Sequence, residues 1–184
     1  MGAFEALFAF YSLLLGLAIA AVATGFGEQW RRRRVQAIGV LVPLLGVYVL
    51  LATTDQWLSF YGARNSLAMN PINLLTCLVM ALPYIFVAQV MFPISGEQGA
   101  DGDCHYLTDR RILLGVLVMP LALSLMFNLI FNPLFFAGPD RLKDAASFIL
   151  PVIVLMPLMF VRNRTWHVAG LTALILFRLA AIFS

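Results

Sequence analysis

Charged residues are scarce in this chain: only 11% of its 184 residues are Asp, Glu, Lys or Arg, while 62% are hydrophobic. Soluble globular domains carry about 25% charged residues. The low charge and a mean hydropathy of +0.93 therefore exclude an ordinary soluble domain and predict a membrane protein. The net charge is only +3, and we expect it to orient the chain in a bilayer, not to bind nucleic acid.

Residue types that commonly do chemistry in membranes are also few. The chain has two Cys, two His and one Lys. Lys143 lies outside the apolar runs, which excludes a retinal Schiff base inside a helix. His105 and His167 lie in a polar segment and near the end of a run, which argues against a pair of haem ligands. Acidic and His side chains are missing near the middle of the runs, which argues against proton-coupled transport.

Six long apolar runs are present, and they are 17 to 22 residues long. The first five contain no charged residue, and the sixth contains only Arg178. About 20 helical residues cross a hydrocarbon layer of ~30 Å, and backbone groups in lipid must be paired within their own segment. We therefore predict one all-α domain over residues 1–184, a polytopic bundle of six transmembrane helices. The predicted spans cover residues 6–26, 35–54, 71–92, 112–131, 145–161 and 165–183.

Arginines gather in alternate connections. The first, third and fifth loops hold eight arginines, whereas the second and fourth hold three basic residues. Basic residues stay on the cytoplasmic side, so these three loops are predicted to be cytoplasmic and both termini extracytoplasmic. We expect a multi-pass protein of the cell membrane, namely a bacterial inner membrane, with the first helix retained. Four successive arginines of the first loop are also expected to contact anionic lipid headgroups: Arg31, Arg32, Arg33 and Arg34.

The second loop, residues 55–70, is half apolar. Trp57, Phe60 and Tyr61 have helical spacing. The pattern predicts a short helix in the headgroup layer, ending at Gly62 and separate from the second span.

The third loop, residues 93–111, holds the densest functional chemistry of the chain: His105, Asp109, Arg110 and Arg111. Asp109 is expected to start the next helix. The spacing matches no known metal motif, so no metal or cofactor is expected. This segment is one candidate surface for a soluble partner or an anionic headgroup. Cys104 lies here and Cys77 lies within a span, so both are expected to be free thiols.

Small side chains recur every four residues along the first run, at Ser12, Gly16, Ala20 and Thr24. Such a stripe allows two helix backbones to approach closely. It could join the first helix to a neighbour in the same chain or to a second copy.

Arg178 lies well inside the last run, where a charge is costly unless it is paired or reaches the interface. We predict that it pairs with Glu5, which lies at the same outer level. Asn128 and Asn132 lie one helical turn apart and either bond across helices or line a polar path.

Three function classes follow from these features. The first is a non-catalytic membrane protein that acts through lateral helix contacts, as an accessory subunit or a self-associating scaffold. The second is a passive channel or small-solute transporter built around Asn128. The third is a lipid-modifying enzyme that uses His105, Asp109 and the neighbouring arginines at the membrane surface. The absence of catalytic and ion-coupling groups favours the first class.

Overall fold

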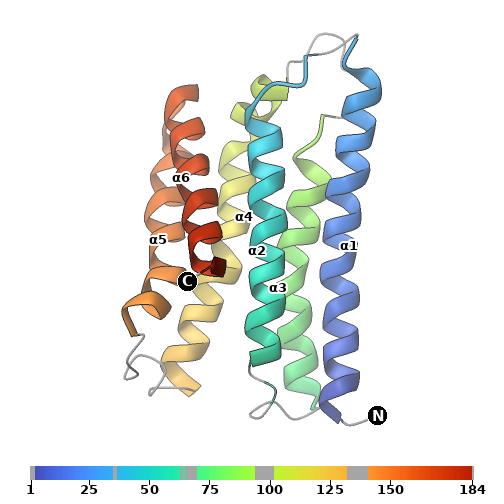
Figure 1. The fold of residues 1–184 in the computed structure, drawn as a ribbon, viewed down its shortest axis with the longest axis vertical. Helices are drawn as coiled ribbons and strands as arrows, with labels where there is room; N and C mark the ends of the chain where they lie inside the picture. The colour runs from blue at the N-terminus through green and yellow to red at the C-terminus, as the bar shows by residue number, and fades with distance from the viewer. Residues whose placement is uncertain are drawn as a thin grey trace.

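The structure, a computed structural model, describes residues 3–34, 37–62, 64, 70–93, 102–131 and 141–183, without the side chains of 3, 127, 128, 130, 131, 141–145, 182 and 183. Six helices run antiparallel and side by side in the described part (Figure 1), which contains no strand. The predicted all-α, six-helix architecture is confirmed. The helices are α1 (Ala3–Arg32), α2 (Leu41–Gly62), α3 (Pro71–Val90), α4 (Gly102–Phe131), α5 (Arg141–Phe160) and α6 (Arg164–Phe183).

Three of these helices, α1, α2 and α3, are long and apolar enough to cross a membrane. Only 28% of the most apolar window of α1 is buried inside the bundle, so most of that window faces outward. Large exposed apolar side chains also occur on the other helices, for example Ile72 and Ile153. Apolar surface of this extent is unfavourable in water and favourable against lipid chains. Crossing by α4, α5 and α6 remains a prediction.

The second helix differs from its predicted limits. It begins at Leu41 and continues to Gly62, so Trp57, Phe60 and Tyr61 extend α2 instead of forming a separate short helix. The predicted span was ended at the first charged residue, Asp55. Helical hydrogen bonding does not depend on hydropathy, and no glycine or proline interrupts the backbone between residues 47 and 61.

The fourth helix also begins earlier than its apolar run. It starts at Gly102, so the polar segment from His105 to Arg111 is helical and forms the first turns of α4. The expectation that Asp109 starts this helix is therefore wrong. Hydropathy marks where a helix enters lipid, and it does not mark where the helix itself begins.

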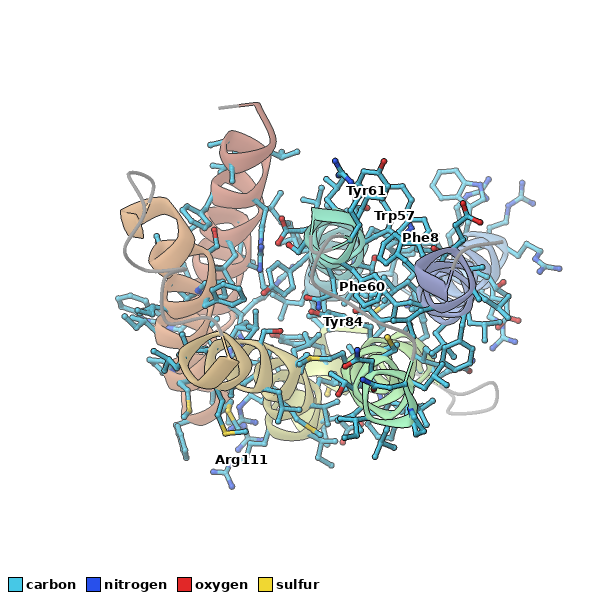
Figure 2. The ribbon with its side chains drawn as sticks, turned by 90° about the horizontal axis from the view of Figure 1, so that it is seen from below. Phe8, Trp57, Phe60, Tyr61, Tyr84 and Arg111 are labelled. Carbon is cyan, nitrogen blue, oxygen red and sulfur yellow. The ribbon has the colours of Figure 1, made fainter. Side chains whose placement is uncertain are left out.

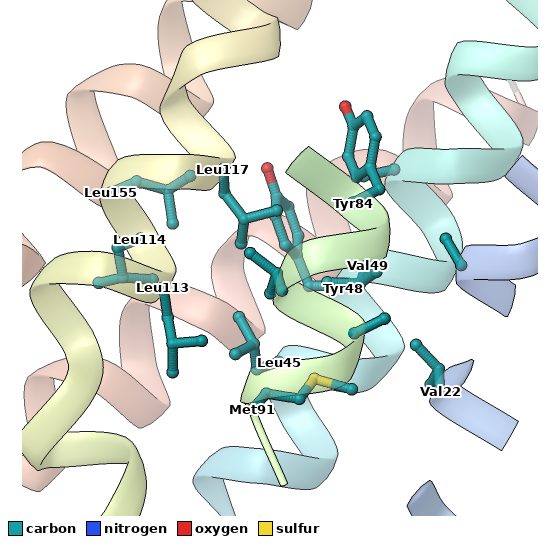
Figure 3. Packing of buried hydrophobic residues seen from close by; sticks show 14 of the residues in the cluster. Val22, Leu45, Tyr48, Val49, Tyr84, Met91, Leu113, Leu114, Leu117 and Leu155 are labelled. Atoms are coloured by element: carbon teal, nitrogen blue, oxygen red, sulfur yellow. The ribbon is translucent and has the colours of Figure 1, made fainter. Parts of the chain in front are cut away.

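The core at the centre of the bundle is rich in Leu and Tyr side chains, with Val, Ala and Met between them (Figure 3). Leu113 and Leu117 of α4 are buried together with Leu45 and Tyr48 of α2 and Tyr84 of α3. Since lipid is as apolar as leucine, this packing stabilises the bundle through close van der Waals contact.

Close approach of α1, α2 and α3 depends on glycine. A Cβ at Gly25 would lie 2.1 Å from the ring of Phe92, and a Cβ at Gly46 would lie 2.4 Å from the ring of Phe26. The two Phe rings contact each other edge to face, with centroids 5.5 Å apart. Each glycine thus makes room for an aromatic ring from a neighbouring segment.

Gly39 permits the turn that leads into α2. Its φ is +73°, a backbone conformation that residues with a Cβ rarely adopt. A Cβ at this position would also lie 2.4 Å from Oδ1 of Asp103. Both the backbone conformation and the close carboxylate require glycine.

We predict that Gly39→Ala destabilises the protein by at least ~1–2 kcal/mol, from the left-handed backbone alone. Gly27→Ala is the matched control, because nothing lies within 4 Å of its added Cβ. Unfolding of the detergent-solubilised protein measures both variants. Equal stability of the two would contradict the described turn.

Candidate functional site

Asp103 links three segments at the arginine-rich end of the bundle. The residue is only 4% exposed. Oδ1 accepts hydrogen bonds of 2.7 Å from the backbone N–H groups of Val40 and Leu41, and Oδ2 lies 2.7 Å from Nε of Arg164. The side chain therefore satisfies amides at the start of α2 while pairing with a cation of α6.

A second network joins α4 to the turn between α5 and α6. Nε2 of His167 lies 3.0 Å from the carbonyl oxygen of Val161, which can only accept, so this nitrogen carries the hydrogen. In the neutral ring Nδ1 then accepts from the Tyr106 hydroxyl, 3.0 Å away. Burial raises the pKa of Tyr106, against a smaller opposing effect of Arg110, so the hydroxyl keeps its proton. Nε of Arg110 donates to the same carbonyl over 3.0 Å.

The predicted residues His105 and Asp109 lie together on α4. Nδ1 of His105 is 3.7 Å from Oδ2 of Asp109, and Nε2 is 3.1 Å from the carbonyl oxygen of Val90. Both ring nitrogens therefore face acceptors of the protein itself. In the neutral ring Nε2 donates to the Val90 carbonyl, whereas Nδ1 lies beyond hydrogen-bonding distance of Asp109.

Arg110 and Arg111 point apart. Arg110 turns inward to Val161, whereas Arg111 projects from the surface of the bundle (Figure 2). The Arg111 guanidinium lies 6.0 Å from the centre of the Phe160 ring. Arg110 therefore stabilises the fold, whereas Arg111 remains at the surface.

Arg178 has a different partner from the predicted one. It is 5% exposed and forms an ion pair with Asp55 of α2, close enough to Tyr48 for a hydrogen bond as well. The predicted pair with Glu5 is wrong because α6 packs against α2 and α5, whereas Glu5 lies exposed on α1.

Asp55 was missed because it stands just past the predicted second span. In the continuous helix it lies ~5 Å along the axis from the midpoint of α2. An acidic group therefore does occur near the middle of a helix that can cross a membrane, contrary to the expectation from sequence. The lone arginine in the last apolar run was the signal, because a cation there requires an anion on a neighbouring helix.

An aromatic cluster lies at the other end of the bundle, where α1 begins and α2 ends (Figure 2). The ring of Phe8 lies 5.2 Å from Trp57 and 5.6 Å from Tyr61, measured between centroids. The indole N–H of Trp57 donates to the hydroxyl of Ser12 over 2.8 Å. Arg64 lies over the Tyr61 ring at 5.0 Å. Aromatic rings with a basic residue are typical of a membrane interface.

The small-residue stripe of α1 divides into two parts. Ser12 is used inside the chain by Trp57, whereas Gly16, Ala20 and Thr24 are exposed. No atom of another segment lies within 4 Å of a Cβ built on Gly16. This part of the stripe therefore contacts no other helix of the described chain closely.

The four arginines at the end of α1 are all exposed, two in its last turn and two directly after it. Nε of Arg31 donates to the carbonyl of Gly27, and Arg33 donates to the carbonyl of Trp30 while lying 4.3 Å above its ring. These two cations complement the carbonyl end of the helix. Arg32 and Arg34 stand beside them at the same end.

The remaining predicted residues are only partly visible. Asn132 lies outside the described residues, and so does the side chain of Asn128. Cys77 is buried and Cys104 is exposed, and neither forms a disulfide. Within the described residues, no group of three or more His, Cys, Asp or Glu could hold a metal ion.

No protein family, curated protein or solved structure matches this chain.

Replacing Asp103 by Ala should cost ~3–5 kcal/mol, because it leaves two backbone amides and a cation without their anion. Replacing Arg164 by Gln should cost less than that, because Asp103 keeps its hydrogen bonds to two backbone amides and the Arg164 side chain is 56% exposed. Equilibrium unfolding of both variants tests this asymmetry. Similar losses would contradict the capping role of Asp103.

Asp55 and Arg178 should show strong coupling in a double-mutant cycle with Asp55→Asn and Arg178→Gln. Asp55→Asn leaves a buried guanidinium unpaired and should cost ~3–5 kcal/mol, whereas the second substitution should then add little. The control cycle uses Glu5→Gln with Arg178→Gln, whose losses should add. Coupling of Arg178 to Glu5 instead of Asp55 would refute the pairing.

Proposed function

We propose that this chain is a multi-pass membrane protein that acts through lateral helix contacts, as a self-associating scaffold or an accessory subunit. The observation that carries the proposal is the outward stripe of α1, where Gly16, Ala20 and Thr24 are exposed. Small residues on a lipid-facing helix allow another backbone to approach closely, which is the main source of helix association in bilayers. The contact surface of the proposed assembly is this face of α1.

The proposed orientation has six spans, cytoplasmic first, third and fifth loops, and extracytoplasmic termini in a bacterial inner membrane. The antiparallel order of the helices supports it, because it brings the arginine-rich connections to one end (Figure 1). Exposed indoles support it too: Trp30 and Trp166 lie near that end, and Trp57 lies near the other. Trp is enriched at both interfaces of a membrane.

The other two function classes have less support. For catalysis, the His105 side chain is only 14% exposed, and its Nε2 is hydrogen-bonded to the carbonyl oxygen of Val90. For transport, the described part has a cavity of about 20 Å³ beside Gly25 and Gln29 and an open, mostly apolar hollow of about 470 Å³ beside Phe26, Trp30 and Ile38. Both are lined by residues of the arginine-rich end of the bundle. The proposed polar path relied on Asn132 and the side chain of Asn128, which lie outside the described part.

Replacing Gly16 and Ala20 together by Leu should weaken self-association about tenfold, or ~1.4 kcal/mol, because the added side chains hold the second backbone away. Energy transfer between labelled copies in liposomes measures the association. Ala122→Leu is the matched control, since Ala122 is exposed on α4.

The expected result is weaker association of the double variant and unchanged association of the control. A wild-type protein that stays monomeric at all protein-to-lipid ratios would refute self-association. Capture of a larger complex in mild detergent, lost in the same double variant, would then indicate the accessory role.

A further inference from the structure

We propose that Arg111 and Arg162, two exposed arginines near the exposed Phe160, bind the phosphate of an anionic phospholipid. The proposal rests on the membrane location proposed above and gives the lipid contact a defined place. We call this surface the arginine corner: Arg111, Phe160, Arg162 and Trp166.

The corner is built on a fixed turn. Arg110 donates to the carbonyl of Val161 over 3.0 Å, and His167 donates to the same carbonyl over 3.0 Å. These two hydrogen bonds hold the α5–α6 turn against α4. Arg111 and Arg162 are the chain neighbours of Arg110 and Val161, so the fixed turn brings their backbones together.

Charge at the corner is unbalanced. The start of α4 (residues 102–111) and the turn before α6 (residues 160–166) together hold four arginines and two aspartates. Both aspartates already have partners in the protein. Asp103 pairs with Arg164, and Asp109 lies beside His105. Within the described residues no ion pair involves Arg111 or Arg162, so two positive charges face the surroundings. Arg111 visibly projects away from the bundle (Figure 2).

Apolar rings at the corner favour a lipid over a free phosphate. Phe160 is 70% exposed and Trp166 is 64% exposed, and they lie on the two sides of Arg162 in the chain. Rings of this kind gain free energy when they enter the acyl and headgroup boundary, while a guanidinium forms paired hydrogen bonds with phosphate oxygens. One phospholipid offers both partners.

Two of the four arginines at the end of α1 are less suited to this role. Arg31 and Arg33 already donate to the carbonyls of Gly27 and Trp30, and Arg33 lies over the Trp30 ring. A lipid phosphate there would compete with contacts inside the chain. Within the described residues, the guanidinium groups of Arg111 and Arg162 form no hydrogen bond with a carbonyl.

Native mass spectrometry of the purified full-length protein in mild detergent tests the proposal, with phosphatidylglycerol and phosphatidylcholine as probes. The wild type should retain phosphatidylglycerol preferentially. Each Arg→Gln change at 111 or 162 should weaken that binding about fivefold, and the double variant about thirtyfold. The double variant Arg111→Lys, Arg162→Lys should bind phosphatidylglycerol more tightly than the double Gln variant and less tightly than the wild type. Lysine keeps the positive charge but lacks the paired N–H donors of the guanidinium.

Arg64→Gln is the matched control, since it removes one exposed arginine at the other end of the bundle. It should leave phosphatidylglycerol binding unchanged. Equal retention of the two lipids, or wild-type binding by the double Gln variant, would overturn the proposal. Displacement of the lipid by millimolar inorganic phosphate would overturn the assignment to a lipid. Self-association, measured with the Gly16 and Ala20 variants, is a separate readout, so failure of either proposal can be recognised.

Discussion

Pairing of charges inside an apolar bundle is the constraint on which this structure depends. Asp103 and Arg178 are both buried, and an unpaired charge in such surroundings is too costly to keep. Each finds its partner on a different helix: Arg164 on α6 for the first and Asp55 on α2 for the second. Asp103 also accepts hydrogen bonds from the backbone at the start of α2. Buried charged groups therefore fix α2 at two places: Asp103 near its beginning, and the Asp55–Arg178 pair past its midpoint.

The number of helices and their class followed from hydropathy, because six uncharged or nearly uncharged runs of this length leave no other arrangement. The residues at which the helices begin and end were harder to predict from the sequence. The run that ended at Thr54 continues as helix past Asp55, and the helix expected near Ile112 begins ten residues earlier at Gly102. Hydropathy reports the solvent of each residue, whereas helix limits depend on backbone hydrogen bonds that also form outside lipid.

The candidate residues were found more easily than their partners. His105, Asp109, Arg110 and Arg111 were recognised as the densest polar chemistry, and they do lie together at the start of α4. The partner of Arg178 was wrong because depth in the membrane says at what level a residue lies and not which helices are neighbours. Since polar groups of the interior mostly contact one another, the features left for function are on the outside, on α1 and at the arginine corner.

Labelling of the two native cysteines with a membrane-impermeant maleimide tests the central claim, an apolar bundle in lipid with its arginine-rich end in the cytoplasm. Cys104 is exposed next to Asp103, and Cys77 is buried in α3. In single-cysteine variants, Cys104 should react only after the cell membrane is opened, and Cys77 only after the protein is unfolded. Reaction of Cys104 in intact cells, or of Cys77 in sealed membranes, would contradict the account.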